Sequence, residues 1–245
     1  MGLRHNVCNP LILFILSLSF FSLVFIFIFR RPRHSEQFLE FIHIPKNAGT
    51  TIENIANEEG IKWGRFKPKF RETLTDKSNG CAYWHTPPRN FDKKTSPYAT
   101  DETFCVIRDP VERLISEYKY RFRDGHDSAG VYFTPYSLNK WIELVIKEDF
   151  HLSGKMNCHH LPQSQYVFDE NGVRTCDNIL RFDYLNDDFT NLMKEHDLEH
   201  LKLDTKHNIS SSHNQPELRP DDITQENMKR IQSVYKDDFE LLSGL

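Results

Sequence analysis

A lysine, an asparagine, a glycine and two threonines stand close together at residues 46–51, directly after an apolar run. The run, residues 41–44, is rich in β-branched side chains and predicts a buried strand, which ends at a proline that has no N–H to donate. Gly49 allows a tight turn, and the apolar spacing after it predicts a helix that begins near Thr50. A strand, a short loop and a helix N-terminus together offer N–H groups and a positive dipole end to an anion. With Lys46 added, the segment predicts a phosphate or sulfate site.

The order of these residues differs from the nucleotide-binding motif G-x-x-x-x-G-K-[ST]. Here Lys46 precedes Gly49, whereas in that motif the lysine follows the glycine. This difference argues against an ordinary ATP or GTP site, although a phosphate site of related geometry fits. The alternative is a plain turn between a strand and a helix, with a solvated lysine.

A second strand-to-helix junction follows at residues 103–123. Residues 103–107 predict a buried strand, and Asp109 with Glu112 three residues later predicts a capped helix start. Arg108 lies between them, where open α/β sheets bind ligands, and arginine suits two-pronged phosphate contacts. Ser116, two turns into the helix, adds a hydroxyl donor. The alternative is a surface ion pair of Arg108 with Asp109 or Glu112.

A histidine between the two junctions is a candidate general base. His85 follows Tyr83 and Trp84 and precedes a rigid Thr-Pro-Pro turn, so its ring is expected to be held in place. A structural or surface histidine is the alternative. Upstream, basic and aromatic residues alternate over residues 62–71, which indicates either a grip on an acidic or sugar ligand or a solvated surface.

Composition indicates a folded chain that does not bind nucleic acid in general. Of the 245 residues, 27% are charged and 13% aromatic, which suits a single domain of catalytic size with extra segments. The net charge is −4, but residues 1–34 carry four arginines and no acid, so the remainder has a net charge of −8. A domain this acidic meets a polyanion only through a local basic patch.

Residues 11–29 are apolar except for three serines, and this run of 19 residues is just long enough to span a lipid bilayer. No small-x-small cleavage pattern follows it, so we expect a signal anchor and no cleaved peptide. The predicted organisation is a tail at 1–10, a transmembrane anchor at 11–29, a stem at 30–37 and a catalytic domain at 38–245. Three arginines directly after the anchor would by themselves place that domain in the cytoplasm.

The cysteines and one sequon bear on the cellular compartment. Cys158 and Cys176 flank a compact loop and are a possible disulfide in an oxidising lumen, whereas Cys105 is expected to be a buried thiol and Cys81 has no obvious partner. Asn208 begins the chain's N-x-[ST] sequon. No C-x-x-C occurs, so no metal site is expected.

The remaining periodic segments complete an α/β pattern. Helices are predicted at 137–147, 184–196 and 223–242, and a further strand at 178–182. Strands that alternate with helices indicate a mainly parallel central sheet flanked by helices.

Both junctions together resemble the membrane-anchored carbohydrate sulfotransferases, including those that act on heparan, chondroitin and dermatan chains. H-I-P-K-N-A-G-T-T resembles that family's loop for the 5′-phosphosulfate of 3′-phosphoadenosine 5′-phosphosulfate (PAPS). V-I-R-D-P-V-E-R-L-I-S-E-Y resembles its 3′-phosphate motif, an arginine followed eight residues later by a serine. Segments further on, such as H-H-L-P-Q-S-Q-Y-V, extend the resemblance from about residue 38 to the C-terminus.

The resemblance implies a P-loop-like sulfotransferase fold and specific roles. PAPS is bound by a first set of residues, Pro45, Lys46, Asn47, Ala48, Gly49, Thr50 and Thr51, and by a second set, Arg108 and Ser116. Lys46 stabilises the charge that grows on the leaving oxygen, and His85 takes the proton of the acceptor hydroxyl. No metal takes part.

The resemblance also implies a location and a class of acceptor. It indicates a single-pass Golgi membrane protein of type II, with a luminal catalytic domain and a carbohydrate acceptor, against the orientation that the flanking arginines favour. The sugar, the hydroxyl and the oligomeric state stay open.

Two other readings stay open at this stage. A P-loop kinase or nucleotidase would need a Walker lysine and a metal-binding acid after a strand, and neither is evident in the sequence. A non-catalytic, membrane-tethered protein that binds a glycan or a nucleotide would need only the fold.

Overall fold

The computed structural model describes residues 39–67, 80–91, 96–99, 102–122, 133–152, 154–203 and 217–245. These belong to one compact unit, residues 38–245. The strands are β1 (Leu39–Ile42), β2 (Glu102–Ile107) and β3 (Asn178–Arg181). The helices are α2 (Gly49–Glu58), α3 (Pro110–Arg121), α4 (Pro135–Lys147), α5 (Ser164–Val167), α6 (Leu185–Glu195), α7 (Gln225–Val234) and α8 (Lys236–Ser243).

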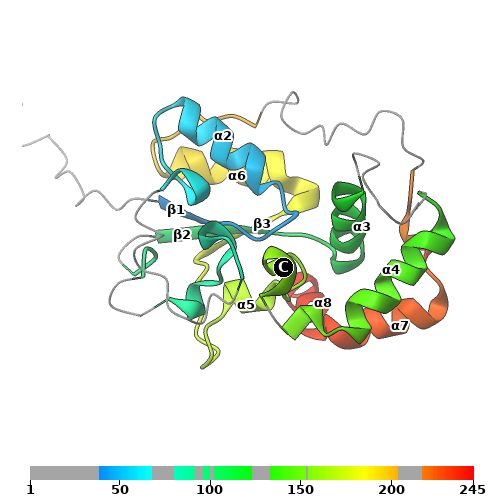
Figure 1. Ribbon diagram of the computed structural model, residues 1–245. Coiled ribbons are helices and arrows are strands. Elements are labelled where there is room, and N and C mark those ends of the chain that lie inside the picture. The colour runs from blue at the N-terminus through cyan, green and yellow to red at the C-terminus, as the bar shows by residue number, and fades with distance from the viewer. Residues whose placement is uncertain are drawn as a thin grey trace, which may run out of the picture. The chain divides into compact units, whose positions relative to one another are not determined.

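The three strands form a parallel sheet in the order β1-β2-β3, with helices on both sides (Figure 1). Phe41 is in register with Phe104, and Cys105 with Ile179. The predicted α/β fold with a parallel sheet is confirmed for this part of the chain. Because all strands point the same way, the loops that follow β1 and β2 lie at one edge of the sheet.

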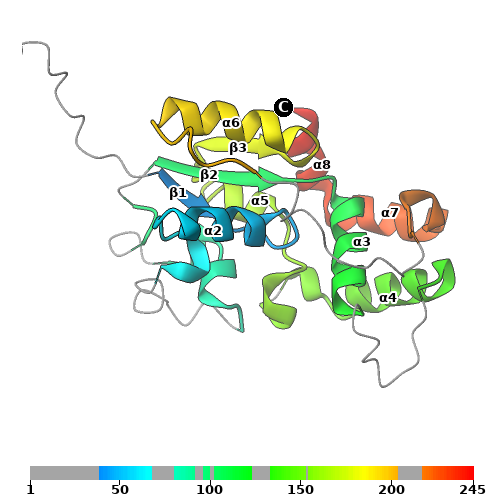
Figure 2. The same ribbon diagram turned by 90° about the horizontal axis from the view of Figure 1, so that it is seen from above.

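Successive residues of β1 and β2 face opposite cores, as the two-residue period of a strand requires. Phe41, Phe104 and Val106 pack with α2 and α6, which lie over one face of the sheet (Figure 2). Ile42 and Ile107 pack on the other face with α5 and the segment before it. Burial on both faces explains why these strands read as continuous apolar runs.

A third apolar core joins α3, α4 and α7 beside the sheet, with Tyr118 and Trp141 among its buried side chains. The C-terminal helix predicted at 223–242 is instead two helices, α7 and α8, which meet at Tyr235. Tyr235 is buried, and its hydroxyl donates to the His160 carbonyl at 2.9 Å. The break lets Asp238 on α8 accept hydrogen bonds from the backbone N–H groups of Gln163 and Ser164 at 2.8 and 2.9 Å.

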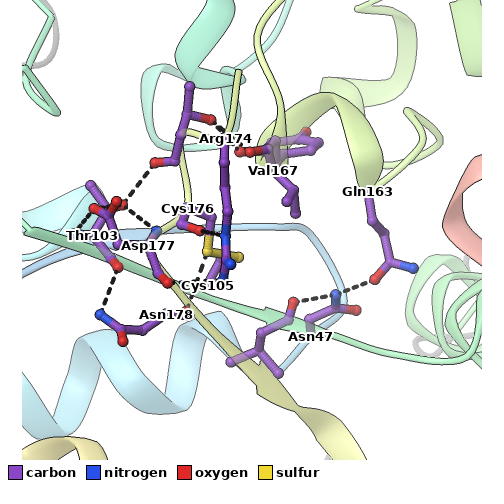
Figure 3. Close-up of a disulfide and its surroundings, with 12 residues drawn as sticks. Asn47, Thr103, Cys105, Gln163, Val167, Arg174, Cys176, Asp177 and Asn178 are labelled. Atoms are coloured by element: carbon purple, nitrogen blue, oxygen red, sulfur yellow. Dashed lines mark hydrogen bonds between the residues drawn. A yellow bond between two sulfur atoms is a disulfide. The ribbon is translucent and has the colours of Figure 1, made fainter. Parts of the chain in front are cut away.

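The disulfide pairing differs from the prediction. Cys158 and Cys176 are both oxidised, but Cys158 is bonded to Cys81, with a Cα–Cα distance of 5.2 Å. Cys176 is bonded to Cys105, with a Cα–Cα distance of 6.1 Å (Figure 3). Cys105 is therefore not a free thiol. The reason is the sheet: Cys105 lies in β2, and Cys176 lies two residues before the adjacent β3, so chain segments 71 residues apart become neighbours.

Some predictions fall outside the described residues, namely the tail at 1–10, the anchor at 11–29, the stem at 30–37 and the sequon at Asn208. Within the described ranges, none of the helices combines the length and apolar character needed to cross a bilayer.

Candidate functional site

The loop after β1 turns through two left-handed residues, Lys46 with φ 71° and Ala48 with φ 63°. Gly49 does not supply the turn, contrary to the sequence-based interpretation. Its role is spatial, because a Cβ at position 49 would collide with the imidazole ring of His43. Glycine is needed here so that His43, at the end of β1, can pack against the first turn of α2.

Asn47 holds this loop against the neighbouring strand. Its side chain is 1% exposed, and Nδ2 donates to the Val106 carbonyl at 2.7 Å and to Gln163 Oε1 at 2.6 Å (Figure 3). The Asn47 amide nitrogen is therefore occupied by the fold, so a donor that Asn47 offers to an anion comes from its backbone N–H.

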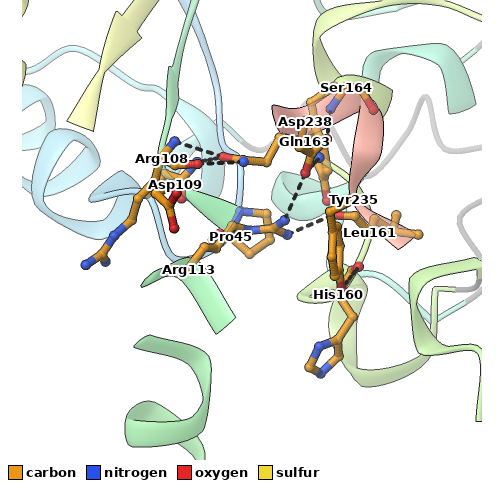
Figure 4. Close-up of polar contacts among 12 residues, drawn as sticks. Pro45, Arg108, Asp109, Arg113, His160, Leu161, Gln163, Ser164, Tyr235 and Asp238 are labelled. Atoms are coloured by element: carbon orange, nitrogen blue, oxygen red, sulfur yellow. Dashed lines mark hydrogen bonds and ion pairs between the residues drawn. The ribbon is translucent and has the colours of Figure 1, made fainter. Parts of the chain in front are cut away.

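Gln163 also holds the second junction. The Arg108 N–H donates to Gln163 Oε1 at 3.0 Å, and Gln163 Nε2 donates to the Arg108 carbonyl at 2.8 Å (Figure 4). One buried carboxamide thus binds both the loop that carries Lys46 and the loop that carries Arg108. The two predicted anion sites lie next to each other at one edge of the sheet.

Arg113, on α3, is a second internal connector. It is 3% exposed, and its guanidinium donates to the carbonyls of Pro45 at 3.1 Å, His159 at 2.9 Å and Leu161 at 2.8 Å (Figure 4). Pro45, predicted to contact the donor, is buried and has its carbonyl oriented toward this arginine. Its role is to fix the start of the loop.

The Arg108 side chain lies along the beginning of α3. Its guanidinium is 4.1 Å from the centre of the Phe182 ring, and Nε and Nη2 donate to Glu112 Oε2 at 3.3 and 3.2 Å. The surface pair with Glu112, considered as an alternative, is thus present. Because Glu112 is 41% exposed, this pair is weak, and an anionic ligand can compete for the arginine.

Asp109 caps α3 as the sequence predicts, accepting hydrogen bonds from the N–H groups of Val111 and Glu112 at 2.9 and 3.0 Å. Glu112, Ser116 and Tyr120 then follow at four-residue spacing, so they form one stripe along the helix. Ser116 is half-buried, and Tyr120 is exposed. Lys46 reaches the far end of this stripe, where its Nζ lies 3.7 Å from the centre of the Tyr120 ring.

The two threonines of the loop have different environments. Thr50 is exposed at the first turn of α2, whereas Thr51 is 7% exposed. The N–H groups in the first turn of a helix have no partner inside the helix. The Thr51 N–H donates to the Ala48 carbonyl at 3.0 Å, so the N–H groups of Gly49 and Thr50 are the candidate donors for an anion beside Lys46.

His85 belongs to a cluster of histidine rings. Its ring centre is 4.6 Å from that of His43 and 4.9 Å from that of His159. Burial, together with these two neighbours, holds the pKa of His85 far below its usual value, so this ring is neutral. Its Nδ1 is buried and has no hydrogen-bond partner among the residues that the structure describes.

The outer two histidines of the cluster each pair with a buried carboxylate. His43 Nδ1 is 2.7 Å from Glu53 Oε1, and His159 Nδ1 is 2.7 Å from Glu117 Oε2. Burial by itself would raise the pKa of Glu117, but the hydrogen bond from His159 and nearby positive charge, including Lys46, hold that pKa below its usual value. Within the described ranges, no three His, Cys, Asp or Glu side chains are arranged to bind a metal ion.

The basic segment at 62–71 is engaged with its own fold where it is described. Arg65 pairs with Glu53 and lies over Phe66, Lys67 pairs with Glu40, and Lys62 donates to Asn57 at 2.5 Å. Residues 68–71 lie outside the described part. The three basic side chains are thus engaged within the domain, and Trp63 between them is 2% exposed and belongs to the core.

Sequence reasoning missed several polar residues of this site, namely His43, Glu53, Arg113, Glu117, His159 and Gln163. One signal was available on α3: Arg113 and Glu117 are four residues apart and flank the apolar stripe, which places two charges at the border of the core. For Gln163 no local pattern gives the role, since its partners are more than 50 residues away.

The geometry can be compared with known proteins. The model of the sulfotransferase family matches residues 33–243, and the chain belongs to this family. Neither the curated proteins nor the solved structures contain a match. Membership in the family establishes a transferase of sulfonate groups.

Proposed function

We propose that this protein transfers a sulfonate group from PAPS to a hydroxyl of a carbohydrate. The observation that carries the proposal is the carboxamide of Gln163, which binds Asn47 at 2.6 Å and the Arg108 backbone at 3.0 and 2.8 Å. It fixes Lys46 and Arg108 on adjacent loops, as a donor with anionic groups at both ends requires.

The residues on α3 fit such a donor. Arg108 is next to Glu112, and Lys46 lies against Tyr120, eight residues further along the helix. Eight residues correspond to about 12 Å along a helix axis. A nucleotide with a phosphate at one end and a phosphosulfate at the other can lie along this stripe.

The chain's own residues would act as follows. Lys46, the first-turn N–H groups of α2 and Thr50 would hold the phosphosulfate, and Arg108 with Ser116 the 3′-phosphate. PAPS supplies an activated sulfonate and a phosphate leaving group. The ammonium of Lys46 would stabilise the negative charge left on that phosphate, and a ring of the histidine cluster, which includes His85, would accept the acceptor's proton. Positive charge from Lys46 and Arg108 makes a metal unnecessary in this scheme.

We further propose a membrane-anchored enzyme with its domain in the Golgi lumen, tethered through residues 11–29. Two disulfides support an oxidising compartment, because such bonds persist there and are rare in the cytosol. A carbohydrate acceptor suits this location. Protease protection in sealed microsomes tests the topology: digestion of the domain without detergent contradicts it.

The function is tested with sulfate-labelled PAPS and desulfated heparan, chondroitin and dermatan chains. We expect transfer to one of them by the wild-type chain, and a loss of about 10²–10³-fold in kcat for Lys46→Ala. Lys62→Ala, a surface lysine that contacts Asn57, is the matched control and should retain full activity.

A non-catalytic binding protein that keeps only the fold is the competing function. It predicts binding of adenosine 3′,5′-bisphosphate or a glycan without transfer to any acceptor. Calorimetric titration with the bisphosphate, run beside the transfer assay, separates the two functions.

A further inference from the structure

Three histidine rings lie side by side near Lys46, and they differ in what their nitrogens contact. His43 is paired with Glu53 and packed against Gly49, so it is part of the framework of the loop. His85 contacts no carboxylate in the described structure, and burial keeps it neutral. His159 alone combines a carboxylate on Nδ1 with a buried Nε2 that has no hydrogen-bond partner among the described residues.

We propose that His159 Nε2 is the general base that takes the proton of the acceptor hydroxyl, and that Glu117 is the residue that positions it. This inference rests on the proposed sulfonate transfer. The Glu117 carboxylate accepts from Nδ1–H at 2.7 Å, which leaves Nε2 as the acceptor nitrogen and stabilises the imidazolium that forms.

The location of His159 agrees with this role. Its ring centre is 5.9 Å from that of Tyr120, the ring on which the Lys46 ammonium lies at 3.7 Å. Lys46 is also near enough to lower the pKa of Glu117. The base and the cation can therefore both reach one bound sulfonate group, the base on the side of the attacking oxygen and the cation on the side of the leaving oxygen.

The backbone before His159 is strained in a way that fixes its position. Met156, Asn157 and Cys158 all have left-handed conformations, with φ between 56° and 62°. For Met156 and Cys158 this conformation is unfavourable, and strain of this kind is maintained only where surrounding contacts enforce it. The enforcing contacts are the Cys81–Cys158 disulfide and the hydrogen bond from Ala82 N–H to Asn157 Oδ1 at 2.5 Å.

The reaction is balanced as follows. The acceptor oxygen forms a bond to sulfur and loses its proton to His159 Nε2. The bond between sulfur and the bridging oxygen breaks, and its electron pair stays with the phosphate of the departing adenosine 3′,5′-bisphosphate, beside Lys46. The proton on His159 is released to solvent after the products leave.

The test uses full-length chains with His159→Gln, Glu117→Gln and, as the rival base, His85→Gln. We expect His159→Gln to lower kcat by about 10²–10⁴-fold, with KM for PAPS and the Kd for adenosine 3′,5′-bisphosphate unchanged. Glu117→Gln should shift the acidic limb of the kcat/KM profile to lower pH, because the protonated ring loses its counter-charge. The charged or titratable groups around this ring and its Glu117 partner are Lys46, His85, Arg113, Tyr120, Arg121 and His160.

A readout that a purely structural histidine would not give is chemical rescue. Added imidazole should restore part of the activity of His159→Ala, and more basic substituted imidazoles should restore more. Ring-nitrogen NMR adds a test without turnover: the wild type should carry its proton on Nδ1 of His159, and Glu117→Gln should lose this preference.

The outcomes separate this inference from the proposed function. If the wild type transfers sulfonate and His159→Gln keeps a normal kcat, the role of His159 is overturned and the proposed function stands. The same conclusion follows if imidazole does not rescue His159→Ala. Absence of transfer by the wild type overturns both.

Discussion

Gln163 closes a ring of two hydrogen bonds on the backbone of Arg108, with Nε2 donating to the carbonyl at 2.8 Å and Oε1 accepting from the N–H at 3.0 Å. Oε1 also accepts from Asn47, so the carboxamide uses both of its functions at the junction of two loops. Gln163 is 1% exposed. Replacement of its amide therefore has consequences for both candidate anion sites at once.

We predict that Gln163→Glu weakens binding of adenosine 3′,5′-bisphosphate by at least about tenfold. The carboxylate cannot donate to Arg108, and it adds a buried negative charge where an anion is to bind; one unsatisfied buried group costs about 1–3 kcal/mol. Calorimetric titration measures the affinity, and thermal unfolding measures the loss of stability. Gln165→Glu, two residues along α5, is the control, and equal effects of both substitutions would contradict the role of Gln163.

A second prediction concerns Glu112, which holds the Arg108 side chain at 3.2–3.3 Å. Glu112 competes with a 3′-phosphate for the Arg108 guanidinium. Glu112→Gln should therefore tighten bisphosphate binding a few-fold, since a surface ion pair contributes about 0.2–1 kcal/mol. Arg108→Lys should weaken it by more than tenfold, since lysine lacks the planar fork. Titration with adenosine 5′-monophosphate is the control: both substitutions should leave its affinity unchanged, and a change of equal size would place Arg108 away from the 3′-phosphate.

Helices and strands could be predicted from the sequence where neighbouring residues determine them. Asp109 caps α3 because its carboxylate reaches the next two free N–H groups, and β1 and β2 are recognisable because both of their faces are buried. The proximity of Lys46 and Arg108 also follows from sequence, since both come directly after parallel strands.

Contacts between distant segments could not be predicted, because spacing along the chain does not give distance across a sheet. Cys105 pairs with Cys176 only because β2 and β3 are neighbours. The sequence suggested that Gly49 is a turn residue. Its actual role, to leave room for the His43 ring, depends on how α2 packs against β1. The same limit hid the partnership of His159 with Glu117, which joins α3 to a segment about 40 residues later.

The two disulfides provide a matched pair for a third prediction. They close segments of 77 and 71 residues, so the chain-entropy model gives each about 4.5 kcal/mol of stability. Only the Cys81–Cys158 bond joins the segment of His85 to that of His159. We expect the double substitutions Cys81→Ser/Cys158→Ser and Cys105→Ser/Cys176→Ser to lower the free energy of unfolding similarly.

Activity should distinguish these two variants. Measured well below both melting temperatures, Cys81→Ser/Cys158→Ser should lose kcat with little change in bisphosphate affinity, whereas Cys105→Ser/Cys176→Ser should retain the kcat of the wild type. Equal kcat in the two variants would show that the first disulfide is not needed to position the histidine cluster.

The fourth prediction is a pH dependence of stability that comes from His160. This residue is fully buried against Trp141 and Phe150, both ring nitrogens lack partners among the described residues, and burial lowers its pKa to about 3. Between that value and the ordinary 6.5, the unfolded chain binds a proton that the folded chain excludes. Stability from this group is therefore complete above pH 6.5 and is lost on acidification, by about 1.4 kcal/mol per pH unit.

His160→Phe removes this titration and keeps a ring between Trp141 and Phe150. Urea unfolding at pH 7.5, 6.0 and 5.0 should show the stability of the wild type falling more steeply than that of the variant, so that their difference shifts by about 2 kcal/mol in favour of the variant at pH 5.0. His196→Phe, at a partly exposed histidine near Glu102, is the control and should keep the steep acid-side slope of the wild type. Parallel curves for the wild type and His160→Phe would contradict this prediction, because they would mean that His160 takes up a proton in the folded chain as readily as in the unfolded chain.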